Sequence, residues 1–361
     1  MMSEWKEYKL GEIASFSYGR LPNKSLLGNG PYTTYSGYKY QELYPEYNCD
    51  EGDVVLVARG VGGTGDVKLT TQKCYLTNLS IKIDLDNDIV LNKYFYYLYQ
   101  IENLRYLDSG SAQSQITIQD LSNVSIEVPS ITQQKEIISI LSSLDDKIDL
   151  LNRENATLEA MAETLFRQWF IEEVKEDWEE GKLRDICEYV KEKADVANID
   201  RNTYVTTENM CSNKQGVVPP SSVPENIKVT IYSPDDILLS NIRPYFKKLW
   251  LSDRNGGCSN DVLCIRSNNE VFKYLVYYTI RQDEFFDYVM LGSKGSKMPR
   301  GDKQHIMNWP IQKPPKQMLK QFNEFVIKSI EKMQNNNRQR LCLEKQRDIL
   351  LPKLMSNSYI I

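Results

Sequence analysis

The chain has 361 residues, of which 41% are hydrophobic and 26% are charged, and its formal net charge is −5. This apolar content suffices for packed cores and excludes a wholly disordered protein. The negative balance excludes a uniformly cationic nucleic-acid coat protein, although it leaves room for a local basic face. The one histidine, His305, argues against histidine-dependent metal sites and against a Ser-His-Asp triad.

The N-terminus lacks the basic segment and apolar core of a secretory signal, and no apolar run approaches the roughly 18 residues that span a bilayer. The seven cysteines are scattered and form no C-x-x-C pair, which is typical of reduced thiols. We therefore expect a cytoplasmic protein that makes no membrane contact.

The sequence repeats itself after about half its length. The segment EWKEYKLGEI at residues 4–13 returns as DWEEGKLRDI at residues 177–186. Further similar segments follow in the same order in both halves: 52–56 and 235–239, 94–97 and 274–277, 110–111 and 292–293, and 152–153 and 337–338. The offset drifts, so loops have gained or lost residues. A period this long indicates a duplicated domain rather than a solenoid repeat.

In the first half, a mixed segment comes first, at about residues 5–130. It contains a strand-like run at residues 53–57 and a glycine-rich run at residues 60–65. Pro129 predicts a boundary, because the residue before a proline favours extended backbone. After it, about residues 132–173 have no glycine and predict a long helix.

The second half has the same order. Its mixed segment covers about residues 178–312 and includes a strand-like run at residues 237–239. A boundary at Pro314 and Pro315 precedes a second predicted helix at about residues 316–351.

Both predicted helices carry a seam with alternating steps of four and three residues, which is the spacing of a coiled coil. The second seam is more polar than the first, and Asn155 and Asn336 are candidates for fixing the register. The seam positions are Ile137, Leu141, Leu144, Ile148, Leu151, Asn155, Leu158, Ala162, Leu165 and Trp169 in the first helix, and Phe322, Val326, Ser329, Met333, Asn336, Arg340, Leu343, Arg347, Leu350 and Leu354 in the second.

Charge favours pairing of the two helices with each other. Residues 131–194 carry a net charge of −7, whereas residues 311–361 carry +6. Opposite charges on heptad helices select partners, and about 40 helical residues span about 60 Å. An antiparallel pair would form a rod with one globular domain at each end. The alternative is that each helix is an ordinary amphipathic helix that packs on its own domain.

Catalytic motifs are missing from the sequence. There is no phosphate-binding G-x-x-x-x-G-K-[ST] loop, no H-E-x-x-H zinc motif and no Asn-Pro-Pro-aromatic tetrapeptide of amino-methyltransferases. The run Gly60-Val61-Gly62-Gly63-Thr64-Gly65 fits neither phosphate motif, and we interpret it as a loop between strands. The alternative is close approach of its bare N–H groups to a phosphate backbone.

Side chains suited to nucleic acid recur in both halves. Lysine and arginine bind phosphates, and arginine and glutamine also bond to base edges. The alternative for any one of them is a solvated surface charge. The predicted DNA-binding residues are Arg20, Lys24, Arg59, Lys68, Gln113 and Gln115 in the first half, and Arg243, Tyr245, Lys247, Lys248, Lys294, Lys297 and Arg300 in the second.

Three segments carry a resemblance to a known family. They are the opening Trp5–Ile13 with its repeat at residues 178–186, the junction VPSITQQKEII at residues 128–138, and the helix end LEAMAETLFRQWF at residues 158–170. Their order, in a duplicated chain, resembles the specificity (S) subunit of Type I restriction–modification enzymes over essentially the whole sequence. The second junction, KPPKQM at residues 313–318, departs from the pattern.

The resemblance implies a mixed α+β fold with two target-recognition domains in tandem repeat, separated by two long helices that form an antiparallel coiled coil. Each recognition domain would read one half of a bipartite double-stranded DNA target, and the helices would set the unread spacer. The expected domains are residues 1–130 and 176–313 for recognition, and residues 131–175 and 314–361 for the two spacer helices.

The resemblance also implies partners. The helices would dock two methyltransferase (M) subunits, which would hold S-adenosylmethionine and the catalytic residues, and restriction/translocase (R) subunits would complete the complex. This chain would then have no cofactor, no metal and no catalytic residue. Two other functions remain open from the residues alone: a coiled-coil scaffold that does not bind DNA, and a self-sufficient methyltransferase or nuclease.

Overall fold

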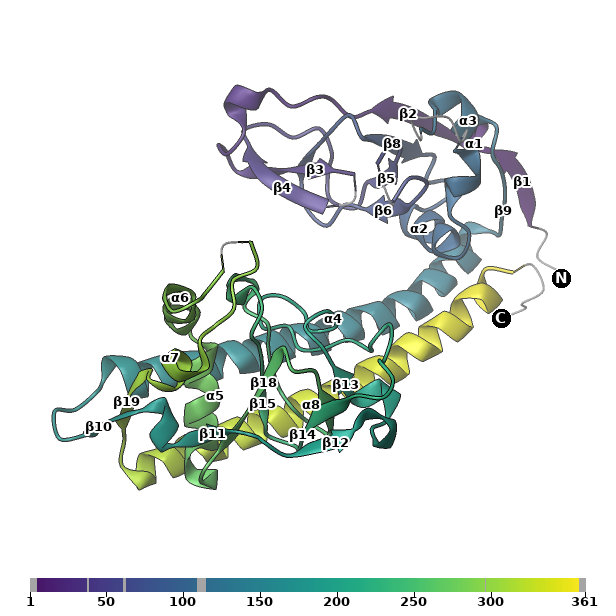
Figure 1. Ribbon diagram of the computed structural model, residues 1–361. Coiled ribbons are helices and arrows are strands. Elements are labelled where there is room, and N and C mark those ends of the chain that lie inside the picture. Colours follow the sequence, from purple (N-terminus) through teal and green to yellow (C-terminus); the bar gives the residue numbers. More distant parts are fainter. Residues whose placement is uncertain (1–4, 38, 61–62, 109–114, 296, 357–361) are drawn as a thin grey trace. The chain divides into compact units, whose positions relative to one another are not determined.

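The computed structural model describes residues 5–37, 39–60, 63–108, 115–295 and 297–356 (Figure 1). It forms two compact units. Unit 1 comprises Met1–Asn152 with Asn337–Ile361, and unit 2 comprises Arg153–Asn336. Both boundaries fall inside long helices, α4 (Ile131–Arg167) and α8 (Lys316–Leu354). Each unit therefore contains a β-rich globular part and a segment of both helices.

Unit 1 has a four-stranded sheet in the order β2-β8-β5-β6, a three-stranded sheet in the order β4-β3-β7, and a separate antiparallel pair of β1 with β9. The strands are β1 (Lys6–Lys9), β2 (Ala14–Tyr18), β3 (Tyr32–Ser36), β4 (Lys39–Tyr44), β5 (Val54–Val57), β6 (Val67–Leu69), β7 (Cys74–Leu76), β8 (Ser80–Leu85) and β9 (Ser125–Val128). The short helices are α1 (Leu10–Ile13), α2 (Asn92–Ile101) and α3 (Ile118–Ser122).

The core of unit 1 forms where the β5 sheet, α2 and both long helices meet. Strand β5 has the sequence VVLV and is fully buried, because it lies between β6 and β8 and has packing on both faces. Tyr94 and Phe95 of α2 share a buried cluster with Leu141 of α4 and Leu354 of α8. The globular part of unit 1 is thus completed by residues from both ends of the sequence.

Unit 2 has two four-stranded sheets, in the orders β11-β18-β15-β16 and β12-β14-β17-β13, and a separate pair of β10 with β19. The strands are β10 (Glu179–Lys182), β11 (Cys187–Tyr189), β12 (Lys193–Asp195), β13 (Tyr204–Val205), β14 (Lys228–Tyr232), β15 (Ile237–Ser240), β16 (Leu249–Leu251), β17 (Gly256–Cys258), β18 (Val262–Ser267) and β19 (Pro310–Lys313). The helices are α5 (Lys273–Arg281), α6 (Asp283–Leu291) and α7 (Lys303–Met307).

The strand orders confirm the duplication. The sheet β2-β8-β5-β6 of unit 1 has the same order, by position in the chain, as β11-β18-β15-β16 of unit 2, and the pair of β1 with β9 corresponds to the pair of β10 with β19. The predicted strands at residues 53–57 and 237–239 are β5 and β15, in equivalent places in these sheets. Similar apolar patterns have therefore produced the same sheet twice.

The two long helices run antiparallel and are in contact within each unit. In unit 1, Asp145 of α4 forms an ion pair of 3.1 Å with Arg347 of α8. In unit 2, Glu154 of α4 forms an ion pair of 3.2 Å with Lys332 of α8. Residue numbers rise along α4 as they fall along α8, so the directions are opposite. Acidic groups of α4 meet basic groups of α8, as the charge balance predicts.

The predicted seam is buried or half-buried at every position in both helices. Near its middle the side-chain amide of Asn336, which is 1% exposed, donates to Oδ1 of Asn155 at 2.9 Å and to Oε2 of Glu154 at 2.8 Å. A polar group buried in an apolar seam is tolerated only where such partners exist, so this contact favours one register over the others. The predicted fold class, two β-rich parts with two long helices in contact, is confirmed.

Both helices end differently from the prediction. Helix α4 stops at Arg167 and continues as a π-helical turn, Gln168–Glu172, which places Phe170 with its ring centroid 5.1 Å from that of Phe322. Helix α8 runs through Pro352 to Leu354, three residues past the predicted end. A proline costs a helix one hydrogen bond, but Leu354 is buried in the core of unit 1, which stabilises the last turn.

We predict that Asn336→Ala destabilises the helix pair, because it removes both hydrogen bonds and leaves Asn155 and Glu154 without these donors. The expected loss in free energy of unfolding is about 1–3 kcal/mol, measured by urea denaturation. The control is Asn335→Ala, which changes an exposed neighbour on the same helix. Equal midpoints for the two variants would contradict a structural role for the buried amide.

Candidate nucleic-acid interface

Two loops that are distant in sequence are joined in the same way in each unit. In unit 1, the loop between β5 and β6 meets the segment before α3 through an isolated bridge between Arg59 and Gln115. In unit 2, the loop between β15 and β16 meets the segment before α7 through a bridge between Ile242 and Arg300. We call residues 58–60 and 63–66 with 115–116 the bridged loop of unit 1. We call residues 241–248 with 294–295 and 297–301 the bridged loop of unit 2.

The hydrogen bonds that hold the bridged loops are equivalent too. In unit 1, the N–H of Ile116 donates to the carbonyl of Ala58 at 3.0 Å, and the N–H of Ala58 donates to the 77–79 connection. In unit 2, the N–H of Gly301 donates to the carbonyl of Asn241 at 3.2 Å, and the N–H of Asn241 donates to Asp261. In unit 2 these segments contain all seven predicted DNA-binding residues, whereas in unit 1 they contain Arg59 and Gln115 of the six.

In unit 1 the structure brings together three of the predicted residues. The backbone N–H groups of Arg20 and Arg59 both donate to the connection between β7 and β8, at Leu76 and Leu79, and Gln115 bridges to Arg59. Both arginines are exposed, and Gln115 is half-buried. These three side chains therefore share one end of the sheets of unit 1.

The other predicted residues of unit 1 lie outside this group. Lys24 is exposed on the short 3₁₀ turn Lys24–Leu26, and Lys68 lies on β6, 3.7 Å from the carboxylate of Asp66. Gln113 lies outside the described residues, as do residues 61–62 of the glycine-rich run. The rest of that run forms a loop between β5 and β6, as predicted.

A glycine is required at the end of this loop. Gly65 has a φ of 94°, and a Cβ atom there would lie 2.4 Å from the backbone nitrogen of Arg105. Its carbonyl also accepts a hydrogen bond of 3.0 Å from Leu104. Only glycine combines this backbone conformation with so close an approach, so Gly65 fixes how the loop packs.

In unit 2 the predicted residues near 245 occupy a 3₁₀ turn, Pro244–Phe246, between Arg243 and Lys247. Tyr245 is exposed, whereas the lysines of this segment bond to the protein itself. Lys247 forms an ion pair of 3.0 Å with Asp283, and Nζ of Lys248 donates to the carbonyl of Thr207 at 2.6 Å. Lys247 and Lys248, which the sequence predicts to bind phosphate, therefore attach the turn to the rest of unit 2.

Three further predicted cations lie on a hairpin in the bridged loop of unit 2. Lys294 and Arg300 exchange backbone hydrogen bonds of 3.0 Å across it, and Lys297 is exposed between them. Nζ of Lys294 lies 3.1 Å from Asp302, and Arg300 lies 3.2 Å from Asp261. All three side chains are exposed, so these surface pairs can be exchanged for other anions at little cost.

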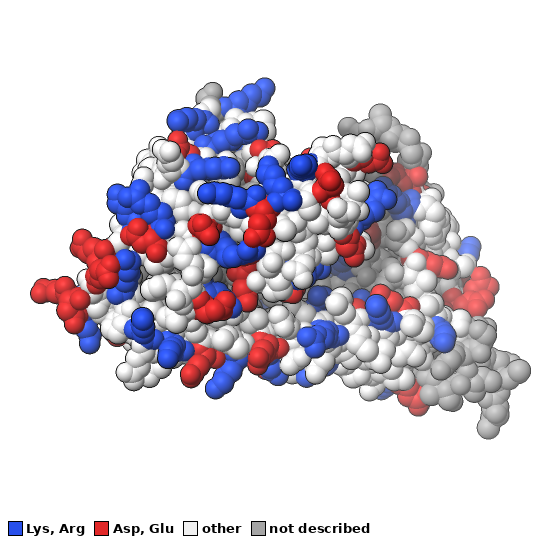
Figure 2. All heavy atoms as spheres, turned by 60° about the horizontal axis from the view of Figure 1, so that its bottom comes forward, with Lys and Arg blue, Asp and Glu red and all other residues white. Residues whose placement is uncertain are grey.

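On the visible face in Figure 2, lysine and arginine side chains lie close together in places, with aspartate and glutamate interspersed among them. Within the described residues, no three potential ligands among His, Cys, Asp and Glu gather into a metal site. None of the helices in this described part combines the length and the apolar character that crossing a bilayer requires.

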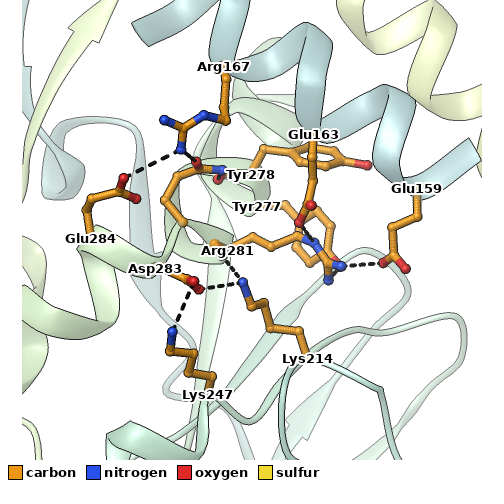
Figure 3. A network of polar contacts seen from close by, with 11 residues as sticks. Glu159, Glu163, Arg167, Lys214, Lys247, Tyr277, Tyr278, Arg281, Asp283 and Glu284 are labelled. Atoms are coloured by element: carbon orange, nitrogen blue, oxygen red, sulfur yellow. Dashed lines mark hydrogen bonds and ion pairs between the residues drawn. The ribbon is translucent and has the colours of Figure 1, made fainter. Parts of the chain in front are cut away.

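The turn is connected to the long helix through a chain of charged residues (Figure 3). Asp283, the first residue of α6, accepts from Lys247 and, at 2.7 Å, from Lys214. Lys214 also donates to the carbonyl of Arg281, whose side chain pairs with Glu159 and Glu163 of α4. The bridged loop of unit 2 is therefore held in place relative to α4.

Asp283 is at the centre of this chain of ion pairs, which we call the ionic brace. The hydrogen bond from Lys214, with a further one from Lys247, holds the pKa of its carboxyl below the usual range, although partial burial opposes the effect. The carboxylate is therefore charged over the neutral range, and it remains charged to a lower pH than an aspartate without these partners.

Sequence reasoning missed two residues of this site. Lys214 lies in a turn at residues 212–216, and its Asn and Gly predict a turn but give no indication of the contact with Asp283. Phe246, which follows Tyr245 and is not among the predicted DNA-binding residues, is 38% exposed, although phenylalanine is more often buried. Both assignments needed the tertiary contacts.

Comparison with known proteins agrees with these observations. Residues 2–160 match the family model described as the Type I restriction modification DNA specificity domain. The chain is 25% identical to the Type I restriction enzyme MjaIX specificity subunit of Methanocaldococcus jannaschii, covering 98% of this chain and 93% of the relative. It is 28% identical to the HindI specificity subunit of Haemophilus influenzae, covering 47% of this chain and 42% of that one.

The fold has a counterpart among solved structures. The S subunit of the Type I restriction–modification system from M. genitalium superposes with a TM-score of 0.65 at 16% sequence identity, covering 98% of this chain and 96% of that one. At this identity the likeness bears on the fold alone.

We predict that Asp283→Asn lowers stability at neutral pH and that the difference from the wild type disappears in acid. A carboxyl whose folded pKa is depressed contributes stability above its unfolded pKa and loses it as the pH falls through the folded pKa. Urea midpoints at pH about 7 and about 2 check this, since the lower pH must lie below the depressed folded pKa. Asp287→Asn, an exposed residue of the same helix, is the control. A difference that is equal at both pH values would contradict the ionic brace.

Proposed function

Since the chain belongs to the DNA specificity subunits of Type I restriction–modification systems, we propose that each of its two globular parts reads one half of a bipartite double-stranded DNA target. The recognition domains are residues 1–130 and 176–313, and the spacer helices are residues 131–175 and 314–361. The specificity subunit is the non-catalytic, cofactor-free chain of such a system. Its role is therefore to select the sequence on which other subunits act.

One observation supports this assignment above the others: the bridged loops occur in both units with the same backbone hydrogen bonds but different side chains. A common scaffold with variable loops suits two reading heads that recognise different sequences. The exposed cations Arg20 and Arg59 in unit 1, and Lys297 and Arg300 in unit 2, supply phosphate contacts, and Gln115 suits a base edge.

The helices α4 and α8 hold the two reading heads at a fixed separation and dock two M subunits. S-adenosylmethionine and the transferring residues belong to those M subunits, and R subunits complete the restriction complex. Half-sites one turn of B-DNA apart are separated by about 34–36 Å, so the separation of the two heads has to match the spacer of the target. A stiff helical pair suits that task better than a flexible linker would. The complex acts in the cytoplasm, where the DNA is.

The first test concerns phosphate contacts. Replacing Lys297 and Arg300 by alanine in the assembled complex should weaken binding to target and non-target duplexes alike, and should lower the slope of log affinity against log salt by about one for each true contact. Lys320→Ala on α8 is the control for a change of charge away from the loops. Binding and slope identical to wild type would show that the hairpin faces away from DNA.

The second test concerns the spacer. Duplicating residues 145–151 of α4 and 340–346 of α8 adds one heptad to each helix while keeping the seam in phase. The unread spacer should lengthen by about 10 Å, or about three base pairs, with both half-sites unchanged. Mapping of methylated bases in cells that carry the chain and its M partner measures this. An unchanged spacer would contradict the role of the two helices in setting the spacer. Methylation that does not depend on the chain would contradict the proposed function.

A further inference from the structure

Two aromatic rings project from the bridged loop of unit 2, on the turn between β15 and β16. Tyr245 is 48% exposed, Phe246 is 38% exposed, and their ring centroids lie 4.7 Å apart. Exposure of two large apolar side chains to water is unfavourable, whereas polar side chains on the same turn would form hydrogen bonds with water. Such exposed patches mark surfaces that meet a partner.

The turn that carries the rings is held in an unfavourable backbone conformation. Arg243 before it and Lys247 after it both have a φ of 50°, in the left-handed region that residues other than glycine rarely adopt. Surrounding contacts must impose this shape, and residues held in this way concentrate at functional sites.

Backbone hydrogen bonds from two other segments supply those contacts. The N–H of Arg243 donates to the carbonyl of Pro299 at 2.8 Å, in the other segment of the bridged loop of unit 2. The N–H groups of Asn213 and Lys214 donate to the carbonyls of Phe246, at 2.9 Å, and Lys247, at 2.8 Å. The backbone of the turn is thus held on both sides, so the position from which the two rings extend is set before any partner binds.

The lysine side chains near the turn are directed toward the protein. Lys247 and Lys214 converge on Asp283, as Figure 3 shows, and Lys248 bonds to the carbonyl of Thr207. With these lysines engaged, the part of the turn that offers free contact surface is apolar. The exposed cations of the neighbouring hairpin, Lys297 and Arg300, give it a positive border that suits a polyanion.

We infer that Tyr245 and Phe246 contact the bases of the second half-site and determine part of its sequence. This rests on the proposed function and names the reading residues within it. Flat apolar rings recognise bases by packing against thymine methyl groups or by wedging at a base step, while cations beside them hold the phosphates. A turn whose backbone is already held loses less entropy on binding than a flexible loop would, which favours discrimination.

The matching loop of unit 1 offers no such pair. There Arg59 and Gly60 follow β5, and the described part of the loop contains no aromatic residue. The same position in the fold is therefore apolar and aromatic in unit 2 but cationic and glycine-rich in unit 1. A change at Tyr245 and Phe246 should alter only the second half of the target.

The test uses the full chain assembled with its M partner and carrying Tyr245→Ala with Phe246→Ala. The probes are a duplex with the bipartite sequence mapped for wild type and the same duplex with its second half scrambled. The ratio of the two affinities should fall about 10- to 100-fold, while affinity for the scrambled duplex and the salt slope stay at wild-type values. Methylation in cells should lose selectivity in the second half-site and keep the first.

Two further variants keep the result interpretable. Ile227→Ala removes an apolar side chain of unit 2 that is also 38% exposed, and it should leave the affinity ratio unchanged. Tyr245→Leu with Phe246→Leu keeps apolar area without flat rings, so it should reduce selectivity even if the alanine variant unfolds more readily. Wild-type selectivity in the leucine variant, or loss of M binding without loss of selectivity, would overturn the inference. Absence of any chain-dependent bipartite methylation in wild type would instead overturn the proposed function.

Discussion

The structure depends on the pairing of two long helices that neither globular part can do without. Leu141 of α4 and Leu354 of α8 complete the core of unit 1, and Phe166 of α4 and Phe322 of α8 complete that of unit 2. In unit 1, residues from opposite ends of the sequence must therefore meet before the core is closed, whereas unit 2 is one continuous segment, Arg153–Asn336. The core of each unit includes its own segments of both long helices.

The polar contacts along this pair act on direction and register more than on stability. Asp145 meets Arg347, and Glu154 meets Lys332, in an order that only the antiparallel arrangement allows. Partly exposed ion pairs of this kind contribute at most about 1 kcal/mol each. The apolar seam supplies most of the attraction, and the buried amide of Asn336 opposes registers in which it has no partner.

The reading surface shows how far a sequence can predict a site. The clustered cations at residues 243–248 predict one loop, and the repeat matches it with the loop near Arg59, which follows the equivalent strand. The same composition cannot say where a side chain points. Lys247 could face phosphate or protein with equal local propensity, and the choice follows from Asp283, 36 residues away, whose position depends on how α6 packs. Lys214 joined the site for the same reason.

The duplication, the two helices, their opposite charges and the heptad seam can be predicted from the sequence, because these follow from local periodicity and from composition. The resemblance to the specificity (S) subunits follows from the order of the motifs. The bridging of loops distant in the chain, the support of the turn by Lys247 and Lys248, and the outward direction of Tyr245 and Phe246 appear only in the folded structure. Those outcomes depend on long-range contacts, which a pattern along the chain does not encode.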